Sequence, residues 1–204
     1  MDEDLIAHWI EVPGGELRLL QPLESAELPD IGEVEWAPIV PYWSVLWRSG
    51  LALARELDPE AVRGKRVLEL GCGLGVPSIV AARAGAEVLA TDADPEALAL
   101  LERNAAANEA ALETAAIKWS AAETLLERGP FDLVLASDVL YERTSVAPLL
   151  ELLPRLAPEA LLADPGRSPA EPFLEEALRR WPITTRAREV VRIHRLRMNA
   201  VAVG

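Results

Sequence analysis

A glycine-rich turn between a predicted strand and a predicted helix constrains the fold of this chain more than any other feature. Residues 66–70 are mostly apolar and predict a buried strand, and Gly71, Gly73 and Gly75 follow it directly. Glycines at these positions remove the side chains that would keep a ligand away from the backbone. Glu69 places a carboxylate just before the turn, where it would repel a phosphate. The turn therefore favours a cationic or hydroxyl-bearing cofactor over a nucleotide diphosphate.

A second acidic residue, Asp92, ends the next predicted strand, where its carboxylate can bond both ribose hydroxyls of an adenosyl group. The spacing G-x-G-x-G differs from the G-x-G-x-x-G dinucleotide fingerprint, because Val76 follows the last glycine. Glu69 and Asp92 together predict S-adenosylmethionine as the cofactor, and we add Ala93, beside Asp92, to its site. The alternative is a cap or turn role for Asp92, but Asp94 already serves as the cap of the following helix.

Composition limits the class of protein. The chain has 204 residues, half of them apolar, which suits one soluble globular domain. Its formal net charge of −13 argues against a nucleic-acid partner, whose phosphates require a basic surface. No apolar run approaches the roughly 18 residues of a membrane span, and the acidic residues 1–4 lack the basic region of a secretory signal.

The few cysteines and histidines bear on location and on metal binding. Cys72 is the only cysteine, so we expect no intrachain disulfide and a cytoplasmic location. His8 and His194 lie far apart in the sequence, which leaves no zinc-ligand cluster. We therefore expect a site without a metal ion.

From Lys65 onward the pattern alternates strand and helix, which predicts a parallel sheet covered on both faces. The expected strands cover residues 66–70, 87–91, 116–119, 131–137 and 160–163, with extended runs at 183–189 and 192–203 as a closing antiparallel pair. Such sheets bind ligands at the carboxyl ends of their strands. We expect one domain, made of an N-terminal extension (1–40) with short strands, one of them at residues 16–20, a leading helix over residues 44–57 of the segment 41–60, and a core (61–204).

Two tryptophans are candidates for cofactor contacts. Trp119, at the end of the third expected strand, could stack on an adenine ring. Trp47 could lie near the sulfonium, whose positive charge an indole face attracts by roughly 0.5–2 kcal/mol. The alternative for either residue is packing in the core.

Residues that could bind the methyl-accepting group follow the apolar fourth strand. Asp138 could accept an N–H from an attacking amine and orient its lone pair, although its charge would hold a proton on a lysine rather than remove it. Tyr141 would supply an apolar wall and a hydroxyl, and Ser137 joins the cofactor set at the end of the strand. The alternative is that Asp138 caps the next helix and Tyr141 packs. The general base stays unassigned.

Four stretches together resemble the class I S-adenosylmethionine-dependent methyltransferases. They are residues 41–54, the glycine turn at 68–75, an Asp-x-x-Tyr segment at 137–142 and an Asp-Pro-Gly-Arg segment at 163–167. The glycine turn marks the superfamily generally, whereas Asp-x-x-Tyr is more specific to the seven-β-strand protein-lysine methyltransferases. The first and last stretches look most like the methyltransferases of the electron transfer flavoprotein β subunit.

This resemblance implies a Rossmann-like, doubly wound α/β sheet of order 3-2-1-4-5-7-6 with the last strand antiparallel. It implies a protein substrate that presents a lysine, such as the electron transfer flavoprotein β subunit. It also implies cofactor contacts from Trp47, Glu69, Gly71, Asp92 and Trp119, with Asp138 and Tyr141 at the acceptor. The chain departs from the family at residues 47–50, where Trp-Arg-Ser-Gly replaces the usual Trp-Pro-Gly-Gly. Two alternatives stay open: a small-molecule N-methyltransferase and a cofactor-binding module without turnover.

Overall fold

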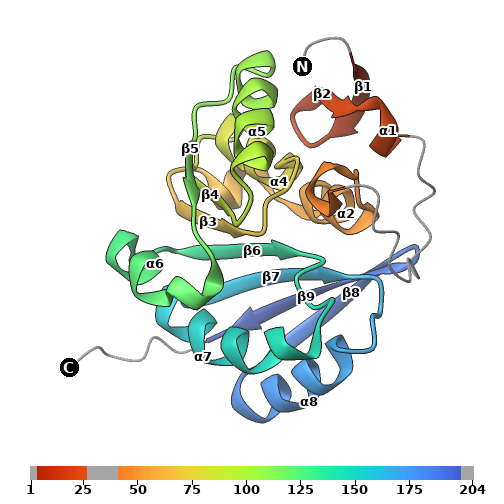
Figure 1. Ribbon diagram of the computed structural model, residues 1–204. Helices are drawn as coiled ribbons and strands as arrows, with labels where there is room; N and C mark the ends of the chain where they lie inside the picture. The colour runs from red at the N-terminus through yellow and green to blue at the C-terminus, as the bar shows by residue number, and fades with distance from the viewer. Residues whose placement is uncertain (1–3, 27–40, 199–204) are drawn as a thin grey trace.

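A seven-stranded sheet forms the centre of the computed structural model, which describes residues 4–26 and 41–198 (Figure 1). Its strands are β3 (Arg66–Leu70), β4 (Glu87–Asp92), β5 (Glu113–Ala116), β6 (Leu133–Ser137), β7 (Glu159–Asp164), β8 (Ile183–Arg188) and β9 (Val191–Arg197). They lie in the order β5-β4-β3-β6-β7-β9-β8. Counted from β3, this is 3-2-1-4-5-7-6, and the last strand is antiparallel to its neighbours. The predicted fold class and strand order are confirmed.

Helices cover both faces of the sheet (Figure 1). One face carries α2 (Arg48–Glu56), α4 (Val76–Arg83) and α5 (Pro95–Ala107), and the other carries α6 (Ala122–Arg128), α7 (Val146–Leu156) and α8 (Ala170–Arg180). The short α3 (Pro59–Val62) links α2 to β3. Among the described residues, no helix combines the length and the apolar character that a membrane crossing requires.

The alternation of side chains along the strands explains why two cores form. In β6, Leu133 and Leu135 pack under α2, α4 and α5, whereas Val134 and Ala136 pack under α6, α7 and α8. All four side chains are buried. Because successive side chains of a strand point to opposite faces, a strand covered on both sides is an unbroken apolar run. The apolar fourth strand of the sequence is therefore a central strand of the sheet.

A β-hairpin of β1 (Leu5–Val12) and β2 (Gly15–Pro22) stands apart from the main sheet, and α1 (Leu23–Ala26) follows it. The strand expected near residues 16–20 lies within β2. Side-chain amides of α5 and of its C-terminal cap bind the free edge of β2: Asn104 of the helix pairs with the backbone of Leu20, and the cap residue Asn108 pairs with the backbone of Arg18. Residues 1–3 and 27–40 of the expected extension lie outside the described residues, as do residues 199–203 of the last expected extended run.

Two predicted elements were misplaced. The third strand ends at Ala116, where it was expected to begin, because the ladder with β4 stops after Ile117 donates to the Asp92 carbonyl and the chain turns into the 3-10 helix η2 (Trp119–Ala121). The leading helix begins at Arg48 rather than at Ser44. Its start is delayed because Val45 and Trp47 have extended backbones after the 3-10 turn η1 (Tyr42–Ser44).

Candidate functional site

A cavity of about 800 Å³ opens at the carboxyl edge of the sheet, beside the ends of β3, β4, β6 and β7. Its wall is formed by the segment 41–50, the glycine turn after β3, residues 92–94 at the end of β4, residues 117–119, the loop after β6 and Arg167 after β7. Sites for small molecules typically enclose about 300–1,000 Å³. Of the predicted site residues, all except Glu69 line this cavity; they are Trp47, Gly71, Gly73, Gly75, Asp92, Ala93, Trp119, Ser137, Asp138 and Tyr141.

The three glycines of the turn meet different neighbours. A Cβ on Gly71 would lie 3.5 Å from the Trp119 ring and 3.5 Å from Val139, and one on Gly73 would lie 3.0 Å from the carbonyl oxygen of Trp43. A Cβ on Gly75 would lie 2.1 Å from Leu101 of α5. Gly71 and Gly73 therefore keep the cavity wall close to the backbone, whereas Gly75 is required for the packing of α4 and α5.

Asp92 ties the glycine turn to the end of β4. One carboxylate oxygen accepts the backbone N–H of Gly73 at 2.9 Å, and the other accepts the N–H of Asp94 at 3.0 Å. Asp94 caps α5, with Pro95 at the first helical position, as predicted. Asp92 thus lies at the cavity with an orientation fixed by the turn, and its remaining lone pairs are suited to hydroxyl donors.

Glu69 lies beneath the turn rather than at the cavity wall, and it is fully buried. Its Oε2 accepts hydrogen bonds from the backbone N–H and from the hydroxyl of Ser78, near the start of α4. Burial raises the pKa of Glu69 to about 8, although both Ser78 donors lower it. Among the described residues, Oε1 has no hydrogen-bond partner. That Glu69 contacts the cofactor stays a prediction.

The two predicted tryptophans lie on separate walls of the cavity. Trp119 begins η2, and its ring lies near Gly71. Trp47 is the residue before α2, and its Nε1 donates to the carbonyl of Tyr42 at 2.9 Å. The guanidinium carbon of Arg167 lies 5.4 Å from the centre of the Trp47 ring. One cation thus already interacts with the indole that was expected to attract a sulfonium.

Asp138 and Tyr141 differ in exposure. The Asp138 side chain is 13% exposed and accepts from Arg167, whereas 57% of Tyr141 is exposed. Burial raises the pKa of Asp138 to about 6, against the opposite effects of Arg167 and Ser49. Burial also raises the pKa of Tyr141, and Glu142 adds to this effect. Asp138 is therefore an inner wall of the cavity and Tyr141 part of its mouth.

Sequence reasoning missed several residues at the cavity. Trp43 lines it, and its Nε1 is buried without a partner among the described residues. Ser49, where the chain departs from the family pattern, lowers the pKa of the Asp138 carboxyl. Arg167 was noted within its motif but was given no role. An arginine in the Asp-Pro-Gly-Arg turn after a strand end is a signal that could have indicated a site residue.

These features fit an adenosyl cofactor. The cavity has a suitable size, Asp92 presents carboxylate oxygens beside Gly73, and the Trp119 ring offers a flat apolar face. The unpartnered Nε1 of Trp43 is a donor for a carboxylate. No group of three or more His, Cys, Asp or Glu residues that could hold a metal ion occurs within residues 4–26 and 41–198.

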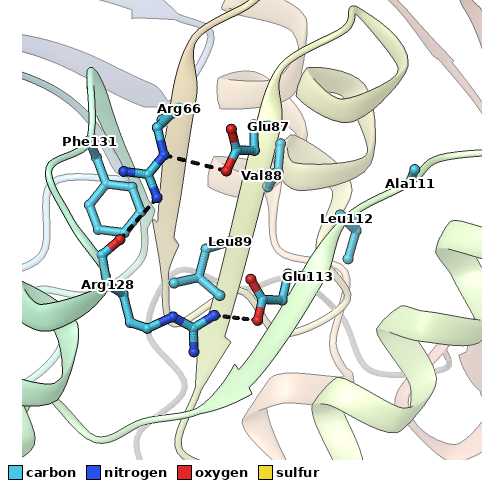
Figure 2. Close-up of a pocket in the computed structure, with 9 residues that line it drawn as sticks. All are labelled: Arg66, Glu87, Val88, Leu89, Ala111, Leu112, Glu113, Arg128 and Phe131. Carbon is cyan, nitrogen blue, oxygen red and sulfur yellow. Dashed lines mark hydrogen bonds and ion pairs between the residues drawn. The ribbon is translucent and has the colours of Figure 1, made fainter.

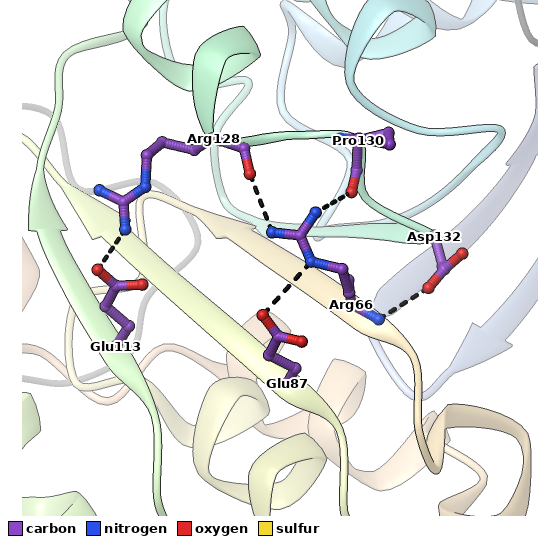
Figure 3. A network of polar contacts seen from close by, with 6 residues as sticks. All are labelled: Arg66, Glu87, Glu113, Arg128, Pro130 and Asp132. Carbon is purple, nitrogen blue, oxygen red and sulfur yellow. Dashed lines mark hydrogen bonds and ion pairs between the residues drawn. The ribbon is translucent and has the colours of Figure 1, made fainter.

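A second cavity, of about 310 Å³, lies at the amino-terminal ends of β3, β4 and β5, opposite the first cavity (Figure 2). Arg66 covers the Phe131 ring there, with its guanidinium carbon 5.3 Å from the ring centre, and pairs with Glu87. Figure 3 shows Arg66 also donating to the carbonyls of Arg128 and Pro130. The charged side chains at this cavity pair with one another, so the network is a structural link between strands rather than a second ligand site.

Comparison with known proteins agrees with this geometry. A family model described as lysine methyltransferase matches residues 36–163, more than half of the chain. The electron transfer flavoprotein β subunit lysine methyltransferase of Xenopus laevis is 38% identical over 137 residues, which cover 63% of this chain and 54% of that protein. The human protein of the same name is 34% identical over 167 residues, 76% of this chain and 60% of that protein. The chain thus spans little more than half the length of these relatives.

Solved structures share the fold. The Thermus thermophilus 16S rRNA N2 G1207 methyltransferase, in complex with S-adenosylmethionine and guanosine, has a TM-score of 0.69 at 23% identity and covers 97% of this chain and 51% of that one. The magnesium protoporphyrin IX methyltransferase from Synechocystis with bound S-adenosylhomocysteine has a TM-score of 0.55 at 19% identity, with 72% of this chain and 80% of that one covered. The fold is that of the S-adenosylmethionine-dependent methyltransferases, and the chain belongs to the lysine methyltransferase family.

Proposed function

We propose that this chain transfers a methyl group from S-adenosylmethionine to the side-chain amine of a protein lysine. The observation that carries the proposal is the position of Asp138: a buried carboxylate at the wall of the cavity, with Oδ2 unpartnered among the described residues and Tyr141 at the mouth. An acceptor-only group in this place suits an N–H donor that enters from outside the sheet. Membership in the lysine methyltransferase family supports the same acceptor.

On the cofactor side, the geometry supports the following proposed contacts. Asp92 would accept from the ribose hydroxyls, and Trp119 would stack on the adenine beside Gly71. Trp47 and Trp43 would approach the methionine end, with Ala93 and Ser137 as further wall residues. Glu69 would act from beneath the turn, through Oε1 or through the Ser78 hydrogen bonds that hold the start of α4.

The chemistry that S-adenosylmethionine supplies when bound is an electrophilic methyl group on a sulfonium sulfur. Methyl transfer is an in-line displacement, so the protein mainly positions the nucleophile. A lysine amine, with an ordinary pKa near ~10.4, must arrive neutral. Asp138 would orient it by accepting one N–H, and Tyr141 would pack along its aliphatic chain. The general base stays unassigned.

Charge at the cavity supports a cationic partner. Among the described residues, four acidic and two basic side chains line it: Asp92, Asp94, Asp138 and Glu142 against Lys118 and Arg167. The relatives are named for the electron transfer flavoprotein β subunit, and we propose that subunit as the first candidate substrate. A cytoplasmic location, suggested by the single cysteine, and a single-domain organisation belong to the same proposal.

Two measurements test the function. S-adenosylhomocysteine should raise the melting temperature, because it binds the folded state only; no shift at saturating ligand would contradict the cofactor. Isotopic methyl transfer to purified electron transfer flavoprotein β subunit, and to small amines, then identifies the acceptor. Label on small amines alone would replace the lysine proposal, and no transfer to any acceptor would indicate a binding module.

Variants separate binding from transfer. Asp138→Ala should keep S-adenosylhomocysteine binding and lose methyl transfer, because it removes the acceptor contact and leaves the turn and Asp92 in place. Glu175→Ala, which removes an exposed carboxylate from α8, is the matched control and should keep both. Full transfer by Asp138→Ala would remove Asp138 from the mechanism.

A further inference from the structure

Arg167 joins three parts of the site. Its Nη2 and Nε both point to Oδ1 of Asp138, at 2.9 and 3.3 Å, and its guanidinium lies over the Trp47 ring. The side chains of this ion pair are only 17% and 13% exposed. A pair shielded from water to this extent is screened less by salt than a surface pair. Removing one partner of such a pair leaves the other charge without compensation.

The backbone of Arg167 is fixed as firmly as its side chain. Oδ1 of Asp164, a residue that is 2% exposed, accepts the N–H of Gly166 at 2.6 Å and the N–H of Arg167 at 2.8 Å. Gly166 has a φ of 92°, which a residue with a Cβ rarely adopts. The Asp-Pro-Gly-Arg turn therefore holds the start of the Arg167 side chain, while Asp138 and Trp47 hold its end.

Asp138 is held from other directions as well. Its φ is 56°, in the left-handed region, and its N–H donates to the Ala163 carbonyl at 3.0 Å. The buried Ser49 of α2 acts on its side chain as well and lowers the pKa of the carboxyl. Ser49 occupies one of the two positions at which this chain departs from the Trp-Pro-Gly-Gly pattern. Contacts from α2 and from the turn after β7 thus converge on one carboxylate.

These contacts treat the two oxygens of Asp138 differently. Arg167 occupies Oδ1, and Oδ2 is buried without a partner among the described residues. We propose that Arg167 is a positioning residue that fixes the Asp138 carboxylate with Oδ1 engaged and Oδ2 left for the N–H of the acceptor amine. The proposal rests on the lysine methyltransferase function above and assigns a role to a residue outside its direct contacts.

The same contacts decide the charge of Asp138. Burial raises the pKa of its carboxyl to about 6; Arg167 and Ser49 lower it, and the neighbouring Asp164 raises it. The groups that act on it come from α2 and from the end of β7 with its following turn. Without Arg167, desolvation and Asp164 would act unopposed by a cation, so the carboxyl pKa would rise and less of the group would be ionised at neutral pH.

The first experiment reads Asp138 directly in the free protein. The carboxyl ¹³C signal of Asp138, assigned by its loss in Asp138→Asn, is titrated in the unaltered chain and in variants. Arg167→Ala and Ser49→Gly should raise the midpoint, and Arg167→Lys should raise it less than Arg167→Ala. Arg179→Ala, which removes an exposed arginine of α8, should leave it unchanged. An unchanged midpoint in Arg167→Ala overturns the proposal.

The second experiment follows transfer. The kcat of Arg167→Ala should fall about 10- to 100-fold, as expected for a misplaced catalytic contact, with S-adenosylhomocysteine affinity retained. The kcat/KM of Arg167→Ala is divided by that of the unaltered protein at each pH, because titration of the acceptor amine affects both values equally and cancels. This ratio should rise with pH as Asp138 ionises in the variant, and it should reach a plateau below one. A ratio that does not vary with pH contradicts the proposed role. If the unaltered protein transfers no methyl group, the proposed function fails, and the carboxyl titration still decides the positioning of Asp138.

Discussion

The carboxylate of Glu69 accepts hydrogen bonds from both the backbone N–H and the hydroxyl of Ser78. The acid that precedes the glycine turn is therefore bonded to the helix that follows it. Ser78 lies in the first turn of α4, whose first N–H groups have no partner within the helix. Glu69 therefore links the end of β3 to the first turn of α4. The acid before the turn has a structural task whether or not it also contacts a cofactor.

Burial of Glu69 predicts a specific dependence of stability on pH. Its pKa is raised to about 8 in the folded protein from an ordinary value of 4.5, so between these values the folded state binds more protons than the unfolded state. The free energy of unfolding should then be highest below pH 4.5, as far as this group is concerned, and should fall as the pH rises towards 8. Urea unfolding at pH 5, 6.5 and 8 measures it. Glu69→Gln is the control that lacks this component, and parallel pH profiles for the two proteins would contradict the assignment.

Asp92→Ala should weaken S-adenosylhomocysteine binding. The carboxylate would bond the ribose and also holds the N–H of Gly73, so both the contact and the shape of the turn are lost. Hydrogen bonds to charged groups contribute about 1.5–3 kcal/mol, which corresponds to a loss of roughly 10- to 100-fold in affinity. Titration calorimetry measures the change.

Asp58→Ala is the matched control for Asp92→Ala. Asp58 precedes a proline and caps α3 through the N–H of Glu60, away from the cavity. Its replacement should reduce stability and leave the affinity for S-adenosylhomocysteine unchanged. Equal affinities of the two variants would remove Asp92 from the cofactor site.

Much of the fold follows from local patterns in the sequence. Apolar runs such as β6 predict central strands because both faces of the sheet are covered, and Asp94-Pro95 marks the start of α5. The errors arose where the third strand and the leading helix were placed by apolar residues. Trp119 and Leu46 are apolar because they lie against a core, not because they belong to regular elements. Tertiary packing determines where these two elements begin and end, and the local sequence pattern does not show that packing.

The candidate site was predictable where it coincides with strand ends. Asp92, Asp138 and the glycine turn follow directly from the rule that ligands bind at the carboxyl edge of such a sheet. The ion pair between Arg167 and Asp138 was not predictable, because it joins residues 29 positions apart through the arrangement of β6 and β7. The placement of Glu69 beneath the turn was also missed, since spacing alone does not show which face of β3 it occupies.

Gly75→Ala should be more destabilising than an alanine at another glycine of the same backbone conformation. Gly75 and Gly64 both have a φ of 70°, but the added Cβ would lie 2.1 Å from Leu101 at Gly75 and would meet nothing within 4 Å at Gly64. Gly64→Ala thus measures the backbone strain alone, and the difference measures overpacking, about 1–3 kcal/mol. Urea unfolding provides both values. In Gly75→Ala/Leu101→Ala the clash is relieved, so its cost should be less than the sum of the single variants; additive costs would contradict the contact.

Asn104→Ala should loosen the N-terminal hairpin. The buried Asn104 amide accepts the N–H of Leu20 at 2.7 Å and donates to its carbonyl at 3.1 Å, in the way a neighbouring strand would. Alanine leaves both backbone groups without these partners, at a cost of about 1–3 kcal/mol. Hydrogen exchange of the Leu20 amide should accelerate, and urea unfolding should report the loss of stability.

The same variant tests whether the hairpin supports the cavity. Gln21, the residue after Leu20, donates to the carbonyl of Ser44 at 3.0 Å, and Ser44 adjoins the cavity residue Trp43. Loosening of β2 in Asn104→Ala should therefore also lower the affinity for S-adenosylhomocysteine, because the segment 41–47 loses a contact that holds it against the site. Asn108→Ala, which affects the more exposed pairing with Arg18, should have a smaller effect on both measurements. Faster exchange at Leu20 with unchanged affinity would show that the hairpin and the cavity are independent.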